Sequence, residues 1–193
     1  MKSMDELAES LYLNSNLSLE NIPDLNLYMD QVIQLFERQF ADTKRNDDEK
    51  ILTKTMINNY AKGKLFFPVE NKKYTKDHLI LISMIYQMKG ALSINDVKST
   101  LAKLNEKVTE DDTFELQDLY ACYLQMVENS AEKFKADLLD HHHELTQALR
   151  KLEDQDEDYL EQLLLIATFT NMSNYYRRAA EKLVDEIGKD DKT

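Results

Sequence analysis

The chain has 193 residues, of which 42% are hydrophobic and 31% are charged, and its formal net charge at pH 7 is −12. This composition is typical of a folded protein of one or two domains and excludes an intrinsically disordered chain. Only three glycines and two prolines are present, and because sheets with tight turns use both residues, we expect an all-α protein.

The sequence carries no sign of export or of membrane insertion. The N-terminal ten residues lack the apolar core of a signal peptide. The most apolar run, 163–167, is far too short to span a bilayer. The single cysteine, Cys122, excludes a disulfide framework and a cysteine-based metal site, and we expect it to be buried. We therefore expect a cytoplasmic protein.

Apolar residues at helical spacing predict a first helix over 4–13. A polar loop follows, and a second helix is expected to begin near Asp24 or Asn26, either of which can cap it, and to end near Phe40. The segment 41–49 has no apolar periodicity and is expected to be a loop.

A third helix is expected over 53–62, with Thr53 as its cap and Gly63 at its end. Its predicted inner face consists of Met56, Ile57, Tyr60 and Ala61. Its predicted outer face consists of Lys54, Thr55, Asn58, Asn59 and Lys62. Such a polar run is often only a solvated surface. Asparagine is a poor helix former, however, so adjacent outward asparagines favour hydrogen bonding to base edges or phosphates.

Residues 69–74 have the length of a small hairpin, with three lysines on its far side: Lys72, Lys73 and Lys76. Thr75 is expected to cap the next helix, which ends around Gly90. Ser93 and Asp96 have the spacing of a capping box and predict a shorter helix, and Thr109 with Asp112 repeats that signal.

The second half of the chain predicts two long helices. Apolar residues recur at spacings of three and four from Thr113 to about Leu152, and a final helix is expected to reach Ile187. The acidic linker 153–158 separates them. Two antiparallel helices with such broad apolar faces must pack on the N-terminal part or on a second subunit, and we expect a homodimer. We place the domains at 1–108 and 109–193.

Charge is segregated along the chain. The segment 44–76 contains nine lysines and arginines but four acids, a net charge of +5, so the rest of the chain carries −17. A basic segment in an acidic protein indicates a phosphate-binding face. The acidic remainder repels nucleic acid at long range, but charges more than about 8–10 Å apart are largely screened at physiological salt.

The block 51–98, preceded by IPDLNLYMDQV, resembles an uncharacterised domain-of-unknown-function family of Gram-positive bacteria. That family in turn looks like a divergent MerR-type winged helix-turn-helix. On this resemblance, Ile57–Tyr60 matches the end of the recognition helix, Lys64–Pro68 its exit, and Ser93–Lys98 the last motif. Asn58 stands where the pattern has arginine, and Lys64 stands where it has glycine.

The resemblance implies a winged helix-turn-helix-like N-terminal part, followed by long C-terminal antiparallel helices that form a dimer. It implies a DNA-binding transcriptional regulator, expected to be a repressor, whose helix 53–62 enters the major groove while the wing 69–76 lies on phosphate. The residues expected to contact double-stranded DNA are Lys54, Thr55, Asn58, Asn59, Lys62, Lys64, Lys72, Lys73, Tyr74 and Lys76.

Two alternatives stay open. The charge of −17 outside the basic segment favours a helical protein-interaction module that does not bind DNA. A small-ligand pocket between the C-terminal helices is compatible with either function, and its expected lining is Tyr120, Tyr123, Phe169 and Tyr176.

No catalytic motif is found in the sequence, and we expect neither an enzyme nor a cofactor. A metal site is considered for the three consecutive histidines, His141, His142 and His143. Consecutive helical side chains point about 100° apart, so three in a row cannot converge on one ion, and we expect no metal.

Overall fold

The computed structural model describes residues 3–152 and 154–190. These residues are mostly helical, as the sequence predicts, and their only sheet has two strands. None of the helices within the two described ranges has the length and apolar character needed to cross a membrane. Some residues named in the predictions lie outside the described residues. These are Glu153, which begins the predicted linker, and residues 1–2 and 191–193, at the outer ends of the two predicted domains.

The described residues fall into two compact units. The larger unit comprises 15–125 and 180–190, and the smaller unit comprises 3–14 and 126–179. Two long helices, α6 (Leu116–Leu149) and α7 (Glu157–Asp190), each contribute to both units. Each unit has its own cluster of buried apolar side chains.

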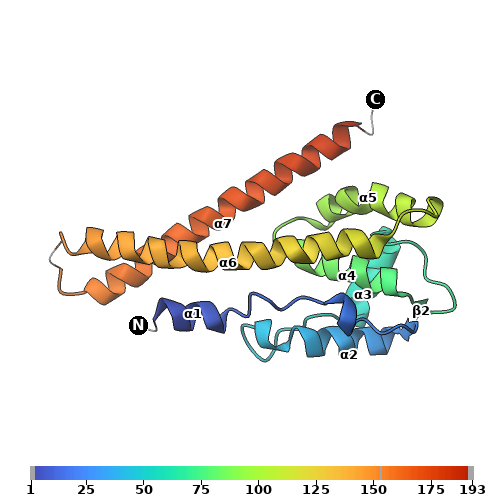
Figure 1. Ribbon diagram of the computed structural model, residues 1–193, viewed down its shortest axis with the longest axis horizontal. Coiled ribbons are helices and arrows are strands. Elements are labelled where there is room, and N and C mark those ends of the chain that lie inside the picture. The colour runs from blue at the N-terminus through green and yellow to red at the C-terminus, as the bar shows by residue number, and fades with distance from the viewer. Residues whose placement is uncertain (1–2, 153, 191–193) are drawn as a thin grey trace. The chain divides into compact units, whose positions relative to one another are not determined.

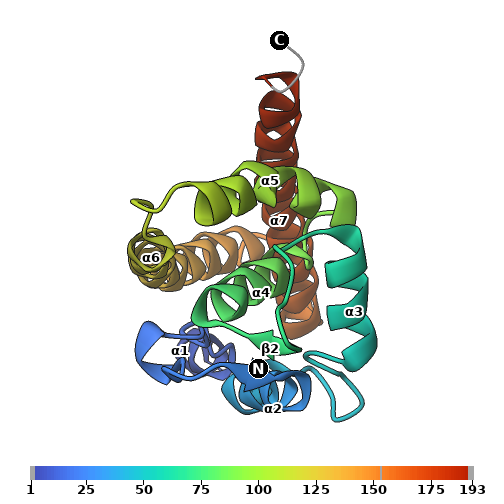
Figure 2. The ribbon, with the colours of Figure 1, turned by 90° about the vertical axis from the view of Figure 1, so that its right-hand side faces the viewer.

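The larger unit is built around α4 (Lys76–Met88). Figure 2 shows α4 enclosed by α2 (Met29–Gln39), α3 (Lys54–Gly63), α5 (Ile94–Glu110) and the start of α6. Burial on nearly all sides explains why α4 carries an almost continuous apolar run instead of a single stripe. Its buried apolar residues are Leu79, Ile80, Leu81, Ile82 and Ile85.

A buried polar link joins three parts of the larger unit. The hydroxyl of Tyr120, on α6, donates to the carbonyl oxygen of Leu17 at 2.8 Å. The Ser83 hydroxyl, on α4, lies 3.0 Å from the same phenol oxygen and can donate to it. Because buried polar groups are costly without partners, this link fixes the segment around Leu17 to both helices.

The predicted caps of three helices are confirmed. Thr53 accepts a hydrogen bond from the backbone N–H of Met56 at 3.1 Å. Thr75 caps α4. Ser93 and Asp96 form a reciprocal capping box, because each side chain accepts from the other residue's backbone N–H.

The starts and ends of other elements differ from expectation. The first helix, α1 (Met4–Ser10), is shorter than predicted, and Tyr12 beyond it has a positive φ of 49°. The second helix begins at Met29, not near Asp24 or Asn26, because the preceding residues form strand β1 (Leu27–Tyr28). β1 pairs antiparallel with β2 (Lys73–Tyr74). Sequence patterns miss strands of two residues because periodicity needs more positions.

The predicted cap at Thr109 and Asp112 is wrong. Thr109 lies inside α5, which has 17 residues and was expected to be short, and its hydroxyl donates to the Asn105 carbonyl at 3.0 Å. A threonine inside a helix can bond the preceding turn in this way and so imitate a cap in the sequence. Two burial predictions are also wrong, since Cys122 and Ala61 are both exposed.

In the smaller unit, the end of α6 and the start of α7 run in roughly opposite directions (Figure 1). Leu138 and Leu165 are buried between them, and Met4 of α1 joins this cluster. Nε2 of His142 lies 2.5 Å from Oε1 of Glu161. His141 packs its ring against Phe169, and His143 instead faces Gln147, so the three histidines have three different partners.

Candidate nucleic-acid interface

Helix α3 presents its polar side chains to solvent. Ile57 and Tyr60 are buried and anchor the opposite face of the helix in the core of the larger unit. The predicted outer residues Lys54, Thr55, Asn58, Asn59 and Lys62 are all exposed. The helix sequence KTMINNYAKG contains no acidic residue. This face therefore combines two lysines with neutral hydrogen-bonding groups.

The exit from α3 is held in an unusual backbone conformation. Lys64 has φ 57° and ψ 44°, in the left-handed region that favours glycine. Its N–H donates to the Ala61 carbonyl, and the Leu65 N–H donates to the Tyr60 carbonyl at 3.0 Å, the two bonds of a Schellman motif. Gly63 stands one residue earlier, where a Cβ atom would lie 2.7 Å from Leu65 Cδ1.

The loop that leads into α3 is fixed by Glu37. Its carboxylate pairs with Lys44 and accepts the backbone N–H of Ile51 at 3.1 Å. The bond from Lys44 is the main reason that the pKa of Glu37 lies below its usual value. Lys89, which follows the last residue of α4, donates to the Ile51 carbonyl at 3.3 Å. The connection from α2 to α3 is long, but these contacts order its second half.

The predicted hairpin is present at 69–74. Lys73 N–H donates to the Glu70 carbonyl at 2.9 Å, and the two residues between them, Asn71 and Lys72, have positive φ angles of 50° and 59°. Two consecutive left-handed residues are typical of the type I′ turns that close tight hairpins. Lys72 therefore lies at the hairpin tip, while the Lys73 ammonium lies 5.6 Å from the centre of the Tyr28 ring.

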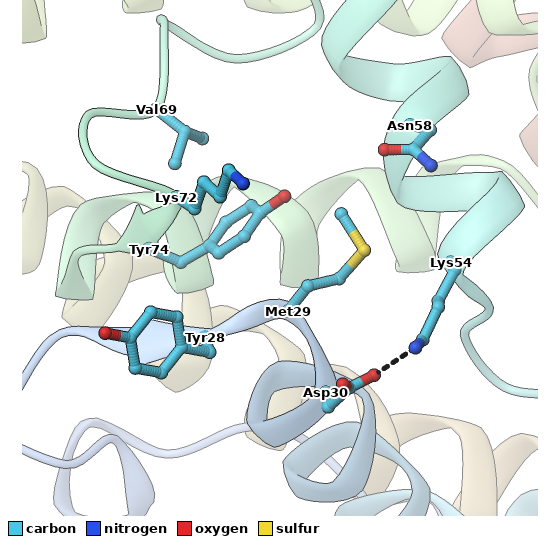
Figure 3. Close-up of a pocket in the computed structure, with 8 residues that line it drawn as sticks. All are labelled: Tyr28, Met29, Asp30, Lys54, Asn58, Val69, Lys72 and Tyr74. Carbon is cyan, nitrogen blue, oxygen red and sulfur yellow. Dashed lines mark ion pairs between the residues drawn. The ribbon is translucent and has the colours of Figure 1, made fainter.

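A groove of about 510 Å³, which we call the α3–hairpin groove, separates α3 from the hairpin. Figure 3 shows Asn58 facing it from α3 and Lys72 extending toward α3 from the hairpin. Lys54 also lines the groove, where its ammonium pairs with the Asp30 carboxylate at 2.7 Å. The groove thus brings together four of the predicted contact residues, namely Lys54, Asn58, Lys72 and Tyr74.

Tyr74 lies in the core beneath this groove. Its side chain is only 4% exposed, and its ring packs edge-on against Phe66 and His78. Burial raises the pKa of Tyr74 above its usual value. The structure therefore gives Tyr74 a packing role and does not place it among the exposed residues expected to contact DNA.

A second groove, of about 420 Å³, lies between α3 and α5, and we call it the α3–α5 groove. Asn59 lines this groove, together with Asn95 and Lys98. Neither Asn95 nor Lys98 was predicted as a site residue. Their position in the sequence identifies the start of a helix, but no local signal indicates that this start lies beside α3.

The remaining predicted lysines are dispersed. Lys73 lines a smaller cavity on the hairpin, of about 210 Å³, with Glu70 and His78. Lys76 lies 3.6 Å from the Asp24 carboxylate. Lys62 and Lys64 are exposed and have no ion-pair partner among the described residues. The predicted site is therefore distributed over several surfaces of the larger unit.

His78 connects the two ends of the hairpin segment. Its Nδ1 accepts the backbone N–H of Thr75 at 3.1 Å, so the ring proton is on Nε2, which donates to the Phe67 carbonyl at 3.2 Å. The side chain is only 2% exposed, and its ring contacts the rings of Phe66, Phe67 and Tyr74. Burial lowers the pKa of His78, and the carbonyl groups of Phe67 and Pro68 partly oppose this shift.

The residues of the predicted ligand pocket belong to different units. Tyr120 and Tyr123 stack on each other in the larger unit, with ring centres 5.8 Å apart. Phe169 and Tyr176 belong to the smaller unit, where Tyr176 is 72% exposed. The pocket that would join them stays a prediction.

Comparison with curated proteins and with solved structures finds no match to this chain. Comparison with protein families finds a match over residues 17–123 to a family described as Domain of unknown function (DUF1836). The matched segment begins at Leu17 and ends at Tyr123, both of which contribute to the apolar cluster of the larger unit. Because the match covers more than half of the chain, the protein belongs to the DUF1836 family of domains of unknown function.

Proposed function

We propose that the protein is a DNA-binding transcriptional regulator of MerR-like winged helix-turn-helix type. In this proposal α3 enters the major groove, and the hairpin lies on phosphate as a wing. The order α2, α3, hairpin, α4 and the pairing of β1 with β2 are compatible with this fold. Residues Ile57–Tyr60, which resemble the end of a MerR recognition helix, lie in the middle of α3.

One observation supports the proposal most strongly: in a chain of net charge −12, the exposed face of α3 carries no acid. A solvated helix in so acidic a protein has no need to exclude Asp and Glu, whereas a helix that approaches phosphate does. Lysines at both ends of α3 and at the hairpin tip supply positive charge around two adjacent asparagines that can bond base edges.

The test is binding of the purified protein to DNA from upstream of its own gene, followed by fluorescence anisotropy across a salt series. We expect sub-micromolar, sequence-selective affinity whose logarithm falls linearly with the logarithm of salt concentration, because each phosphate contact releases bound cations. Competition with an unrelated duplex of the same length measures the selectivity. Absence of salt-dependent, selective binding would reject the proposal.

We also propose that the regulator is a homodimer in which a second copy covers α7. Several large apolar side chains of α7 are exposed, among them Ile166 at 65% and Tyr176 at 72%. Exposed apolar residues at this density mark interaction surfaces. Light scattering should give a dimer mass for the parent protein and a monomer mass for Ile166→Glu. A parent protein that is monomeric at micromolar concentration would exclude this dimer.

The same exposed residues also favour a second candidate function, a helical protein-interaction module that does not bind DNA. Ion pairs on Lys44, Lys54 and Lys76 are consistent with it, because they partly neutralise the basic segment. The anisotropy experiment distinguishes the two candidates. An interaction module should show no selective affinity for duplex at any salt concentration.

A further inference from the structure

Asp30 is the one acidic side chain among the eight residues that line the α3–hairpin groove. Its carboxylate comes from the first turn of α2 and meets Lys54, the first residue of α3 (Figure 3). The amino end of a helix favours negative charge, but α3 has no acid in its first turn. Asp30 therefore supplies from another helix the anion that neutralises Lys54.

A DNA phosphate would compete for the same ammonium. Carboxylate and phosphate oxygens are both anionic acceptors for lysine. The ammonium has three N–H donors but a single positive charge, so a carboxylate that pairs with it weakens its attraction for a phosphate. The side chains of Lys54 and Asp30 are 65% and 66% exposed. Ion pairs with this exposure contribute little to stability and open readily. Lys72, which lines the same groove, has no ion-pair partner among the described residues.

We propose that the Asp30–Lys54 ion pair is an intramolecular competitor of DNA phosphate, which opens when α3 binds DNA. This inference rests on the DNA-binding function proposed above and adds an affinity-limiting residue to it. Asp30 reduces affinity for every sequence by a similar factor, because contacts to phosphate carry no base information. The residue thus limits affinity for selected and non-specific DNA alike, without changing which bases α3 selects.

The test is a double-mutant cycle with Asp30→Asn, Lys54→Ala and the double variant, measured by anisotropy on a selected and an unrelated duplex. Asp30→Asn should raise affinity for both duplexes by about two- to fivefold near 0.1 M salt, in the range expected for an exposed pair. The gain should shrink at higher salt because ions screen the carboxylate. In the Lys54→Ala background the gain from Asp30→Asn should be much smaller, because the carboxylate then acts on phosphate only by longer-range repulsion.

Glu132→Gln is the matched control. Glu132 pairs with Lys135 of α6 at the same 2.7 Å and lies in the smaller unit. The control makes the same change in net charge and should leave affinity nearly unchanged. Asp30→Ala provides a second variant, and thermal unfolding verifies that each variant is folded.

The outcomes separate this inference from the function on which it rests. Selective DNA binding by the parent with no gain in either Asp30 variant would overturn the competitor role and leave the function intact. An equal gain in the Lys54→Ala background would also overturn it, since the carboxylate would then act without Lys54. Absence of DNA binding in the parent and in all variants would reject the proposed function, and the competitor role with it.

Discussion

Asn58 and Asn59 follow each other on α3 but line different grooves: Asn58 lines the α3–hairpin groove, and Asn59 lines the α3–α5 groove. Successive side chains on a helix point about 100° apart, which accounts for the separation. Asn58 shares its groove with Lys54 and Lys72, whereas Asn59 shares its groove with Lys98. The two asparagines are therefore expected to have separate roles on DNA.

Replacing each asparagine should change base preference at a different position of the operator. An asparagine that bonds a base edge contributes about 1–3 kcal/mol of discrimination against the wrong base. Asn58→Ala and Asn59→Ala should each relax one position in a binding-site selection experiment, and the two positions should differ. Asn129→Ala, an exposed asparagine of α6, is the control. Unaltered preference in both variants would exclude base reading by α3.

Replacing Lys64 by glycine should raise the stability of the protein and lower its affinity for DNA. A side chain in the left-handed region costs about 1–2 kcal/mol that glycine avoids. Lys64→Gly should therefore raise the free energy of unfolding by about 1 kcal/mol relative to Lys64→Ala. Both variants should lose DNA affinity equally, because both lack the ammonium. Urea denaturation and anisotropy measure the two effects, and full affinity in Lys64→Gly would show that the lysine does not bind DNA.

The hairpin lysines should contribute affinity without selectivity. Lys72→Ala with Lys73→Ala should weaken binding to all duplexes and reduce the slope of log affinity against log salt by about 0.9 for each phosphate that is no longer neutralised. Of the two single variants, Lys72→Ala should have the larger effect, since the Lys73 ammonium lies over the Tyr28 ring. Lys133→Ala, on an exposed residue of α6, should leave the slope unchanged. A double variant with the parent slope would exclude the hairpin as a phosphate-binding wing.

Features that depend on neighbouring residues were predicted well, apart from the false cap at Thr109. The caps at Thr53, Thr75 and Ser93 need only three or four residues to operate, so their spacing is visible in the sequence. The exposed face of α3 follows from helical periodicity alone. The hairpin at 69–74 likewise follows from its length between two helices.

Features that depend on tertiary contacts were not predictable. Nothing local to Asp30 indicates that its carboxylate reaches Lys54, and nothing local to Lys98 indicates that it lies beside α3. Nothing local to His78, which lies in the polar first turn of α4, indicates that it is buried beneath the hairpin. Strand β1 forms by pairing with β2, and the partner of Leu27 there, Tyr74, lies more than forty residues away in the sequence.

His78 should make stability depend on pH in a defined direction. Its folded pKa is lowered by burial, so folding favours the neutral ring. The stabilisation is fully present above the pKa of unfolded histidine, about 6.5, and is lost as pH falls from there toward the lowered folded pKa. The free energy of unfolding should therefore fall more steeply between pH 7 and 5 in the parent than in His78→Gln. His143→Gln, at an exposed position, should retain the parental slope.

The buried link through Tyr120 should contribute measurably to the stability of the larger unit. Tyr120→Phe leaves the Leu17 carbonyl without its donor and should lower the free energy of unfolding by about 1–3 kcal/mol. Tyr123→Phe is the matched control, because that ring stacks on Tyr120 but its hydroxyl has no hydrogen-bond partner among the described residues. Chemical denaturation compares them, and equal losses would show that the hydrogen bond to Leu17 contributes nothing.

The central claim, that α3 and the hairpin together form a DNA-binding surface, is tested most directly by NMR. The backbone amide resonances of the protein are followed while duplex DNA from upstream of its gene is added. The account predicts that the largest shifts fall on residues 53–64 and 69–74, and that they diminish as salt is raised. Shifts confined to α6 and α7, or no shifts with saturating duplex at low salt, would contradict it.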